Sequence, residues 1–208
     1  MAAGSIRSAT AHRSGASRRV LLANPRGFCA GVQRAIDAVE QALARHGAPV
    51  YVRRAIVHNR DVVERLERLG AVFVQEVDEI PEGAVAILSA HGSARAVRHA
   101  ADARALRTVD AICPLVAKVH AEVEAWYRAG RHVFLIGHLG HPEVVGTLGQ
   151  VPSGAISVIS HAEDLDSLDL PPNSAVAWAV QTTFAMRDAE AMIAAIKARF
   201  RDVAGPRS

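Results

Sequence analysis

Residues 20–43 have the sequence VLLANPRGFCAGVQRAIDAVEQAL, in which a short apolar run, a polar loop and an amphipathic pattern follow one another. The run from Val20 to Ala23 predicts a buried strand, because it is short, apolar and bounded by Asn24 and Pro25. Apolar residues from Val32 to Leu43 then recur at the spacing of one helix face. A strand that leads into a helix is the repeating element of parallel sheets covered by helices.

The same alternation continues through the rest of the chain. Four more apolar runs predict buried strands, at Val85–Leu88, Val133–Ile136, Ile156–Ile159 and Ala175–Val180. Two more helical patterns fall at 116–126 and 192–196. The sequence therefore predicts an α/β fold made of two similar units, each with a small, mostly parallel sheet.

Three segments are expected along the chain. Residues 1–18 are rich in Ser, Ala and Arg and contain no acidic residue, so they predict a disordered basic extension, with an organellar transit peptide as the alternative. Residues 19–107 are expected to form the first α/β unit and residues 108–208 the second, with the boundary near 105–110.

Composition limits the classes of partner. Of the 208 residues, 50% are hydrophobic and 22% charged, which is enough to bury a substantial core. The formal net charge is only +3 and the basic residues are scattered, which argues against nucleic acid and fits a small anionic ligand. No apolar run approaches the roughly 18 residues of a membrane span, and residues 1–18 lack the apolar segment of a secretory signal. We therefore expect a cytoplasmic protein with no membrane partner.

The two cysteines of the chain occupy similar places, after a short apolar run and before a helical pattern. His58 lies 29 residues after Cys29, and His141 lies 28 residues after Cys113. This repeated spacing suggests an internal repeat of 84 residues, which would place the cysteine of a third unit near the end of the chain. A helix N-terminus stabilises a thiolate, so each cysteine is a candidate metal ligand or nucleophile. A buried, inert thiol is the alternative.

Polar residues gather where the predicted strands end, at 24–31, 89–92, 137–143 and 181–183. Open α/β sheets bind ligands at this edge, where helix N-termini offer NH groups to anions. His58, His91 and His141 lie in such loops, where an imidazole can donate to a phosphate oxygen or carry a proton. Glu143 either caps a helix N-terminus or acts as a general acid beside a cationic pocket.

Three other histidines do not lie in loops after predicted strands at equivalent positions. His120, His132 and His138 are expected at a helix surface, a strand edge and a loop, respectively.

Taken in order, these motifs resemble the 4-hydroxy-3-methylbut-2-enyl diphosphate reductase (LytB) family. The resemblance runs from about Arg19 to the end of the chain, and its motifs are long and specific. The matching segments are 20–32, 57–59, 89–92, 113–116, 137–147 and 181–183.

The resemblance implies an iron-sulfur oxidoreductase of isoprenoid biosynthesis. In this family three α/β domains form a trefoil-like arrangement around a cavity, and each gives one cysteine to a 4Fe-4S cluster. Electrons from ferredoxin or flavodoxin reduce 4-hydroxy-3-methylbut-2-enyl diphosphate to isopentenyl and dimethylallyl diphosphate, the last step of the methylerythritol phosphate route.

The resemblance also implies roles for individual residues. Cys29 and Cys113 match cluster ligands. The substrate-binding positions are His58, His91, His141 and Thr182. Glu143 matches the residue that delivers the proton, relayed or positioned by Thr182.

The chain also departs from the family pattern. It ends just after Gly205-Pro206-Arg207, a few residues before the place of the family's third cysteine, so we expect a chain truncated before the third domain and incomplete or inactive alone. Ile112 stands where the family has threonine, and Phe184 and Ala185 stand where it has leucine and serine.

Two other functions stay open at this point. A two-domain relative could be a non-catalytic diphosphate-binding or interaction module that keeps the three histidines. Alternatively, a homodimer could share a cluster held by four cysteines, Cys29 and Cys113 from each chain, with no open iron and hence no catalysis.

Overall fold

The computed structural model describes residues 7–11, 18–24 and 26–206. The chain forms two compact parts, an N-terminal segment up to Ala30 and a main body from Gly31 to Ser208. In the N-terminal segment, strand β1 (Arg7–Ala11) pairs antiparallel with strand β2 (Arg18–Leu22). Within the described ranges, no helix combines the length and the apolar content needed to cross a bilayer.

The structure corrects two expectations for this segment. The run from Val20 to Ala23 falls largely in β2, but Val20, Leu21 and Leu22 are 41 to 59% exposed and their strand is antiparallel. A two-stranded hairpin has no second layer of its own, so an apolar strand within it stays exposed. Most of the extension predicted over 1–18 lies outside the described residues; of its described residues, Arg7–Ala11 form strand β1 and Arg18 begins strand β2.

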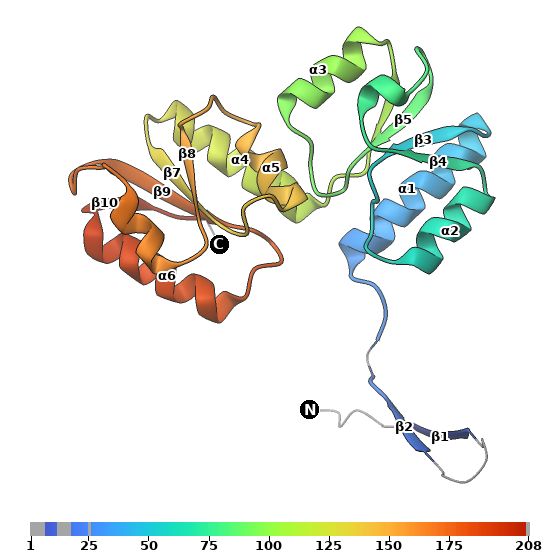
Figure 1. The fold of residues 1–208 in the computed structure, drawn as a ribbon, viewed down its shortest axis with the longest axis horizontal. Helices are drawn as coiled ribbons and strands as arrows, with labels where there is room; N and C mark the ends of the chain where they lie inside the picture. Colours follow the sequence, from blue (N-terminus) through green and yellow to red (C-terminus); the bar gives the residue numbers. More distant parts are fainter. Residues whose placement is uncertain (1–6, 12–17, 25, 207–208) are drawn as a thin grey trace. The chain divides into compact units, whose positions relative to one another are not determined.

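The first α/β unit of the main body contains a parallel sheet of four strands in the order β4-β3-β5-β6. The strands are β3 (Val50–Arg53), β4 (Ala71–Val74), β5 (Val85–Leu88) and β6 (Arg107–Asp110). The helices are α1 (Ala30–His46), α2 (Arg60–Arg68) and α3 (Arg95–Ala103), with a short 3-10 turn at Val77–Glu79. Figure 1 shows these elements in sequence colours.

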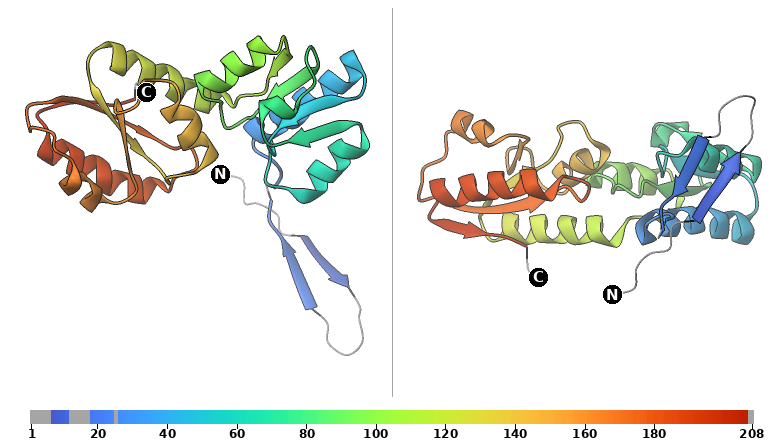
Figure 2. Two further views of the ribbon diagram at one scale, coloured as in Figure 1. Left: turned by 45° about the horizontal axis from the view of Figure 1, so that its top comes forward. Right: turned by 90° about the horizontal axis from the view of Figure 1, so that it is seen from below.

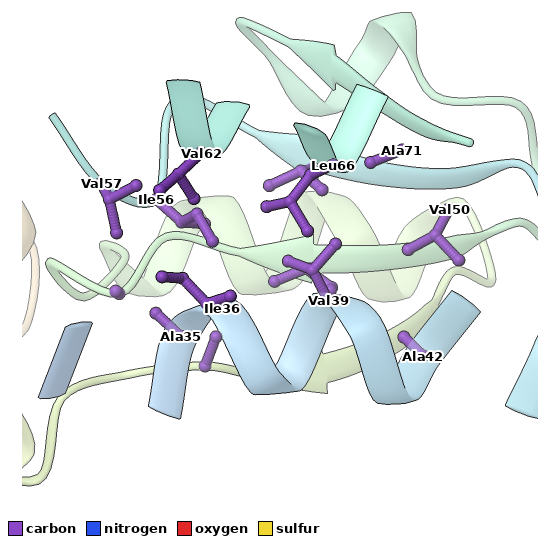
Figure 3. Close-up of a cluster of buried hydrophobic side chains, with 14 of the residues drawn as sticks. Ala35, Ile36, Val39, Ala42, Val50, Ile56, Val57, Val62, Leu66 and Ala71 are labelled. Atoms are coloured by element: carbon purple, nitrogen blue, oxygen red, sulfur yellow. The ribbon is translucent and has the colours of Figure 1, made fainter. Parts of the chain in front are cut away.

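Side-chain alternation along β5 explains how this sheet is covered on both faces. Val85 and Ile87 belong to the core cluster that contains α1 and α2, whereas Ala86 belongs to a separate cluster with Ala101 of α3. Figure 3 shows the first cluster, in which Ile36 of α1 faces the sheet and α2. Buried strands with helices on both faces are typical of parallel sheets.

The second α/β unit repeats this design. Its parallel sheet has the order β10-β9-β7-β8, formed by β7 (His132–Ile136), β8 (Ile156–Ile159), β9 (Ala175–Val180) and β10 (Asp202–Ala204). Its helices are α4 (Pro114–Arg128), α5 (Pro142–Leu148) and α6 (Met186–Arg199), with a 3-10 segment at Ala162–Ser167. The sheet lies between α6 on one face and α4 with α5 on the other (Figure 2).

The α/β class and the two similar parallel sheets are confirmed. Three predicted strands, β5, β8 and β9, have the expected bounds, and β7 begins one residue earlier than expected, at His132. The expected boundary between 107 and 108 falls inside β6, which pairs with β5 and so extends the first sheet to Asp110. The strand escaped prediction because Arg107–Asp110 is an edge strand with a single half-buried apolar residue.

Both sheets have the same topology. Numbered along the chain within each unit, the strands have the order 2-1-3-4. The strand order reverses between the first and third strands, which are β3 and β5 in one unit and β7 and β9 in the other. Ligands of open α/β sheets bind beyond the carboxyl ends of strands at such a reversal.

Candidate functional site

Three imidazoles meet beyond the carboxyl ends of these strands. His58 follows β3, His91 follows β5, and His141 follows β7. The ring centroids of His58 and His91 are 5.3 Å apart, and those of His91 and His141 are 5.9 Å apart. His91 and His141 are half-buried, whereas His58 is exposed. The cluster therefore combines residues from both α/β units.

Local hydrogen bonds orient two of the three rings. Nδ1 of His141 accepts a bond from the backbone NH of Glu143 at 3.2 Å, so a neutral ring carries its proton on Nε2. Nδ1 of His91 lies 3.2 Å from Oγ of Ser89, which also accepts a bond from the backbone NH of His91. A hydroxyl proton donated to Nδ1 leaves Nε2 of His91 as a donor. Both rings can thus present an N–H group to an anion.

The site disfavours protonation of its central histidine. Burial is the main cause that lowers the pKa of His91 to about 4, and the positive charges that His58 and His141 can carry lower it further. His91 is therefore neutral at pH 7. A bound anion would raise the pKa of His91, since a nearby negative charge favours the protonated ring.

A buried carboxylate lies at the corresponding edge of the second sheet. Glu143 is 2% exposed, and its two carboxylate oxygens accept bonds from the backbone NH and the hydroxyl of Thr182, both at 2.7 Å. Glu143 lies in the first turn of α5, but His141 caps this helix. The Glu143 carboxylate instead joins the loop after β7 to the loop after β9, where the Thr182 side chain is exposed.

A glutamine fixes the same two loops. Gln181 is 2% exposed; its Oε1 accepts a bond from the backbone NH of His138 at 3.0 Å, and its Nε2 donates to Oγ1 of Thr183 at 2.7 Å. Gly137 allows this approach, because a Cβ there would lie 2.9 Å from Oε1 of Gln181 and 2.9 Å from Val144. The bonds of Gln181 therefore hold together the two loops that flank the Glu143–Thr182 pair.

The two cysteines precede long helices. Cys113 is half-buried, caps α4 and donates its backbone NH to the carbonyl of Ala90 at 3.0 Å, directly beside His91. Cys29 is exposed and precedes α1 in the N-terminal segment. Neither forms a disulfide. Across the described part of the chain, no three His, Cys, Asp or Glu side chains come together as a metal site.

Sequence patterns did not reveal several residues that support the site. His120 was expected on a helix surface, but it is 6% exposed. The spacing of Val116, His120 and Val123 on one helix face could have revealed this. The close approach of Gly146 to the backbone of Gly92 left no local pattern; a Cβ at Gly146 would lie 2.8 Å from the Gly92 carbonyl oxygen. Of the other two histidines, His132 bonds to Ser157 on the neighbouring strand β8 and His138 lies in an exposed loop.

Comparison with known proteins defines the class. The model of the LytB protein family matches residues 20–207. A 4-hydroxy-3-methylbut-2-enyl diphosphate reductase of Burkholderia pseudomallei is 56% identical over 188 residues, which cover 90% of this chain and 60% of that protein. One from Zymomonas mobilis is 54% identical over 90% of this chain and 55% of its own length.

Solved structures agree with this assignment. The E-1-hydroxy-2-methyl-but-2-enyl-4-diphosphate reductase of Plasmodium falciparum superposes with a TM-score of 0.84 at 37% identity, over 88% of this chain and 57% of that one. A structure described as the terminal enzyme of the non-mevalonate pathway gives a TM-score of 0.78 at 33% identity, over 86% and 64%. The fold and site define an α/β protein with histidine-bearing and carboxylate-bearing loops at the strand reversals of two parallel sheets. The chain belongs to the LytB protein family, and it spans about 60% of the length of the Burkholderia relative.

Proposed function

We propose that this chain provides two α/β units of a 4-hydroxy-3-methylbut-2-enyl diphosphate reductase, which forms isopentenyl and dimethylallyl diphosphate. One observation carries the proposal: the three-histidine cluster and the Glu143–Thr182 pair occupy strand reversals of the two sheets, in a chain 56% identical to a protein of that name. The relatives are longer, so the activity is proposed for an assembly that includes this chain.

The histidines bind the diphosphate in this proposal. The Nε2–H groups of His91 and His141 donate to phosphate oxygens, and His58 lies within the same ring cluster. Bonds between a cationic donor and an anionic acceptor are stronger than neutral ones. Because His91 is neutral without ligand, a bound diphosphate would raise its pKa and draw in a proton.

Glu143 and Thr182 deliver the proton to the substrate. The carboxyl group of Glu143 is buried, whereas the side chain of Thr182 is exposed, so the threonine hydroxyl is the accessible end of the pair. A protonated Glu143 would donate to the hydroxyl oxygen of Thr182, which would pass its own proton outward. Such positioned proton transfer typically accelerates a reaction by about a hundredfold or more.

Cys29 and Cys113 would hold a 4Fe-4S cluster. Their chemistry fits, since both are thiols that precede long helices and both are at least partly exposed. Two cysteines make only part of a ligand set, and among the described residues no three His, Cys, Asp or Glu side chains are placed to hold a metal ion, so other ligands would complete it. When bound, the cluster supplies the electrons of the reduction. A cytoplasmic location and a ferredoxin or flavodoxin donor belong to the same proposal.

One observation also favours a simpler second function. The three histidines, Glu143 and Thr182 all belong to the main body, which contains a complete parallel sheet in each α/β unit. Diphosphate binding therefore does not require Cys29, which belongs to the N-terminal segment. A non-catalytic diphosphate-binding module is the alternative that this separation supports.

The deciding experiment separates binding from reduction. The 208-residue protein is reconstituted anaerobically with iron and sulfide, and the reduction of 4-hydroxy-3-methylbut-2-enyl diphosphate by dithionite and viologen is measured with and without a supplied third-domain fragment. Calorimetric titration with the same diphosphate is run on the wild type, on His91→Ala and on His99→Ala, an exposed control on α3.

Turnover that depends on the added fragment supports the proposed enzyme. Binding that His91→Ala abolishes and His99→Ala preserves, without turnover under either condition, supports the binding module. A brown homodimer without turnover supports the shared four-cysteine cluster. Absence of both binding and turnover rejects the proposed function.

A further inference from the structure

Two buried polar atoms lack hydrogen-bond partners among the described residues, and both belong to side chains that border Gly92. They are Oγ of Ser93 and Nε2 of His120. Ser93 follows Gly92 directly, and the His120 ring packs on Gly92 from α4: a Cβ at Gly92 would lie 2.4 Å from Cε1 and 2.8 Å from Nε2. The two atoms come from different α/β units. Buried polar groups are usually paired, so each requires an explanation.

The turn formed by residues 89–92, which both side chains border, contains His91. Gly92 has a φ of +82°, and its backbone NH donates to the carbonyl of Ser89 at 3.1 Å. Ser89 also bonds to His91 through its hydroxyl. Any shift of this turn therefore moves the His91 ring relative to its neighbours.

The second unit holds this turn through two helices. Val116 and His120 of α4 contact Gly92, and Gly146 of α5 lies against the Gly92 carbonyl. Nε2 of Gln150 donates to the carbonyl of Ser93 at 2.9 Å and to the carbonyl of Gly146 at 2.7 Å. The backbone of Ser93 is therefore fixed, while its hydroxyl is free to change direction by rotation about one bond.

Packing alone does not explain a histidine at position 120. A leucine would fill the site without burying an unpaired nitrogen, which costs free energy. Burial is the main cause that lowers the pKa of His120 to about 4, with Arg98 acting in the same direction and Glu124 against it. A neutral imidazole has one N–H donor and one acceptor nitrogen, so Nε2 can pair with a hydroxyl in either tautomer.

We propose that Ser93 and His120 form a hydrogen bond when His91 engages diphosphate, and that this bond fixes the turn that positions His91. The inference rests on the proposed binding role of His91. Ser93 and His120 are positioning residues in this scheme, since neither contacts the ligand. The bond joins the two α/β units at the place where both contribute to the histidine cluster.

The test is a double-mutant cycle on diphosphate affinity, measured calorimetrically with inorganic diphosphate on the 208-residue protein. The variants are Ser93→Ala, His120→Leu, their combination, and His120→Gln, whose amide can replace Nε2. The matched control is the pair His132→Leu and Ser157→Ala, which removes a histidine–serine bond of 2.9 Å at the amino end of β7.

We expect Ser93→Ala and His120→Leu each to weaken binding by about fivefold to tenfold, the range of one hydrogen bond. The double variant should be no weaker than either single variant, His120→Gln should retain most of the affinity, and the control pair should bind like the wild type. If His120→Leu fails to fold by circular dichroism, Ser93→Ala and His120→Gln decide the question.

Four results would overturn the inference. Unchanged affinity in Ser93→Ala and His120→Leu, together with lost binding in His91→Ala, would overturn this inference and leave the proposed role of His91 standing. Fully additive losses, or equal losses in His120→Gln and His120→Leu, would show that the two residues act separately. No binding by the wild type would overturn both this inference and the proposed role of His91.

Discussion

The two α/β units have the same strand order, yet they place different chemistry at equivalent positions. The first strand of each sheet leads to a histidine, His58 in one unit and His141 in the other. The third strand leads to His91 in the first unit but to Thr182 in the second, where Glu143 lies beneath it. The duplicated topology therefore carries a histidine after the first strand of both units, whereas the third strand leads to an imidazole in one unit and to a carboxyl–hydroxyl pair in the other.

Under the proposed function, this contrast assigns anion binding to the histidines and proton delivery to the Glu143–Thr182 pair. The histidines at the reversal of the first sheet are only partly shielded from solvent, as suits contact with a charged ligand. Glu143 of the second unit is almost completely buried and reaches the surface through Thr182. The topology explains where the groups lie, whereas the side chains decide what each edge can do.

The largest expected effects come from exchanging one residue in each unit. His91→Ala should weaken diphosphate binding about tenfold to a hundredfold, because it removes a hydrogen bond to a charged ligand. Glu143→Gln should leave affinity within about threefold but lower the reduction rate by about a hundredfold or more, because the amide cannot deliver a proton. Calorimetry and the reconstituted reduction assay measure the two quantities.

The control for this pair is Glu190→Gln, which alters an exposed carboxylate on α6. It should change neither quantity. The division of labour would be wrong if Glu143→Gln lost affinity as strongly as His91→Ala, or if His91→Ala bound normally and lost only turnover.

A second prediction concerns the close approach of the two units. Gly146→Ala should lower the free energy of unfolding by about 1–3 kcal/mol, because its Cβ meets backbone atoms that cannot rotate away. Urea denaturation followed by circular dichroism measures the change. Val145→Ala, at an exposed position of the same helix, should change stability by less than about 0.5 kcal/mol. Equal stability of Gly146→Ala and the wild type would mean that the units separate readily at this contact.

A third prediction uses the two histidines whose pKa values are lowered to about 4 from 6.5, His91 and His120. As pH falls below 6.5, the unfolded chain takes up protons before the folded chain does, so their contribution to stability is complete above pH 6.5 and is lost toward pH 4. His120→Leu should therefore unfold with a shallower dependence on pH across this window than the exposed control His99→Ala. Parallel curves for both variants would show that His120 titrates normally.

Five apolar runs predicted strands, but β3 and β4 were not predicted although they are also largely apolar. Runs such as Val85–Leu88 have matching bounds in the structure because burial on both faces of a central strand requires apolar residues throughout. The edge strand β6 carries charged and polar residues, and α5 has only seven residues, so neither left a clear pattern. The apolar run in β2 was visible, but no local pattern reports which layer, if any, covers a strand.

The site was predictable to the extent that sheet topology determines it. Loops after parallel strands open at one edge, which places His58 and His91 of the first sheet near each other. His141 follows a strand of the second sheet, and only the family resemblance implied that it joins them. The burial of His120 against Gly92 depends on contact between segments far apart in the chain. The bond that the Thr182 hydroxyl donates to Glu143 connects the loop after β9 to the first turn of α5, 39 residues earlier in the chain, and only the fold brings them together.

The smallest expected effect separates two kinds of contact between the units. Arg95 of α3 pairs with Glu124 of α4 at 2.9 Å, but the Arg95 side chain is 52% exposed, so Arg95→Ala should cost less than about 1 kcal/mol of unfolding free energy, and less still at high salt. Gln150, 5% exposed, bonds to carbonyls of both units, so Gln150→Ala should cost about 1–3 kcal/mol with little dependence on salt. Urea titrations at low and high salt measure both. A salt-sensitive loss in Arg95→Ala that matched the loss in Gln150→Ala would mean that surface charge, rather than the buried amide, joins the units beneath the histidine cluster.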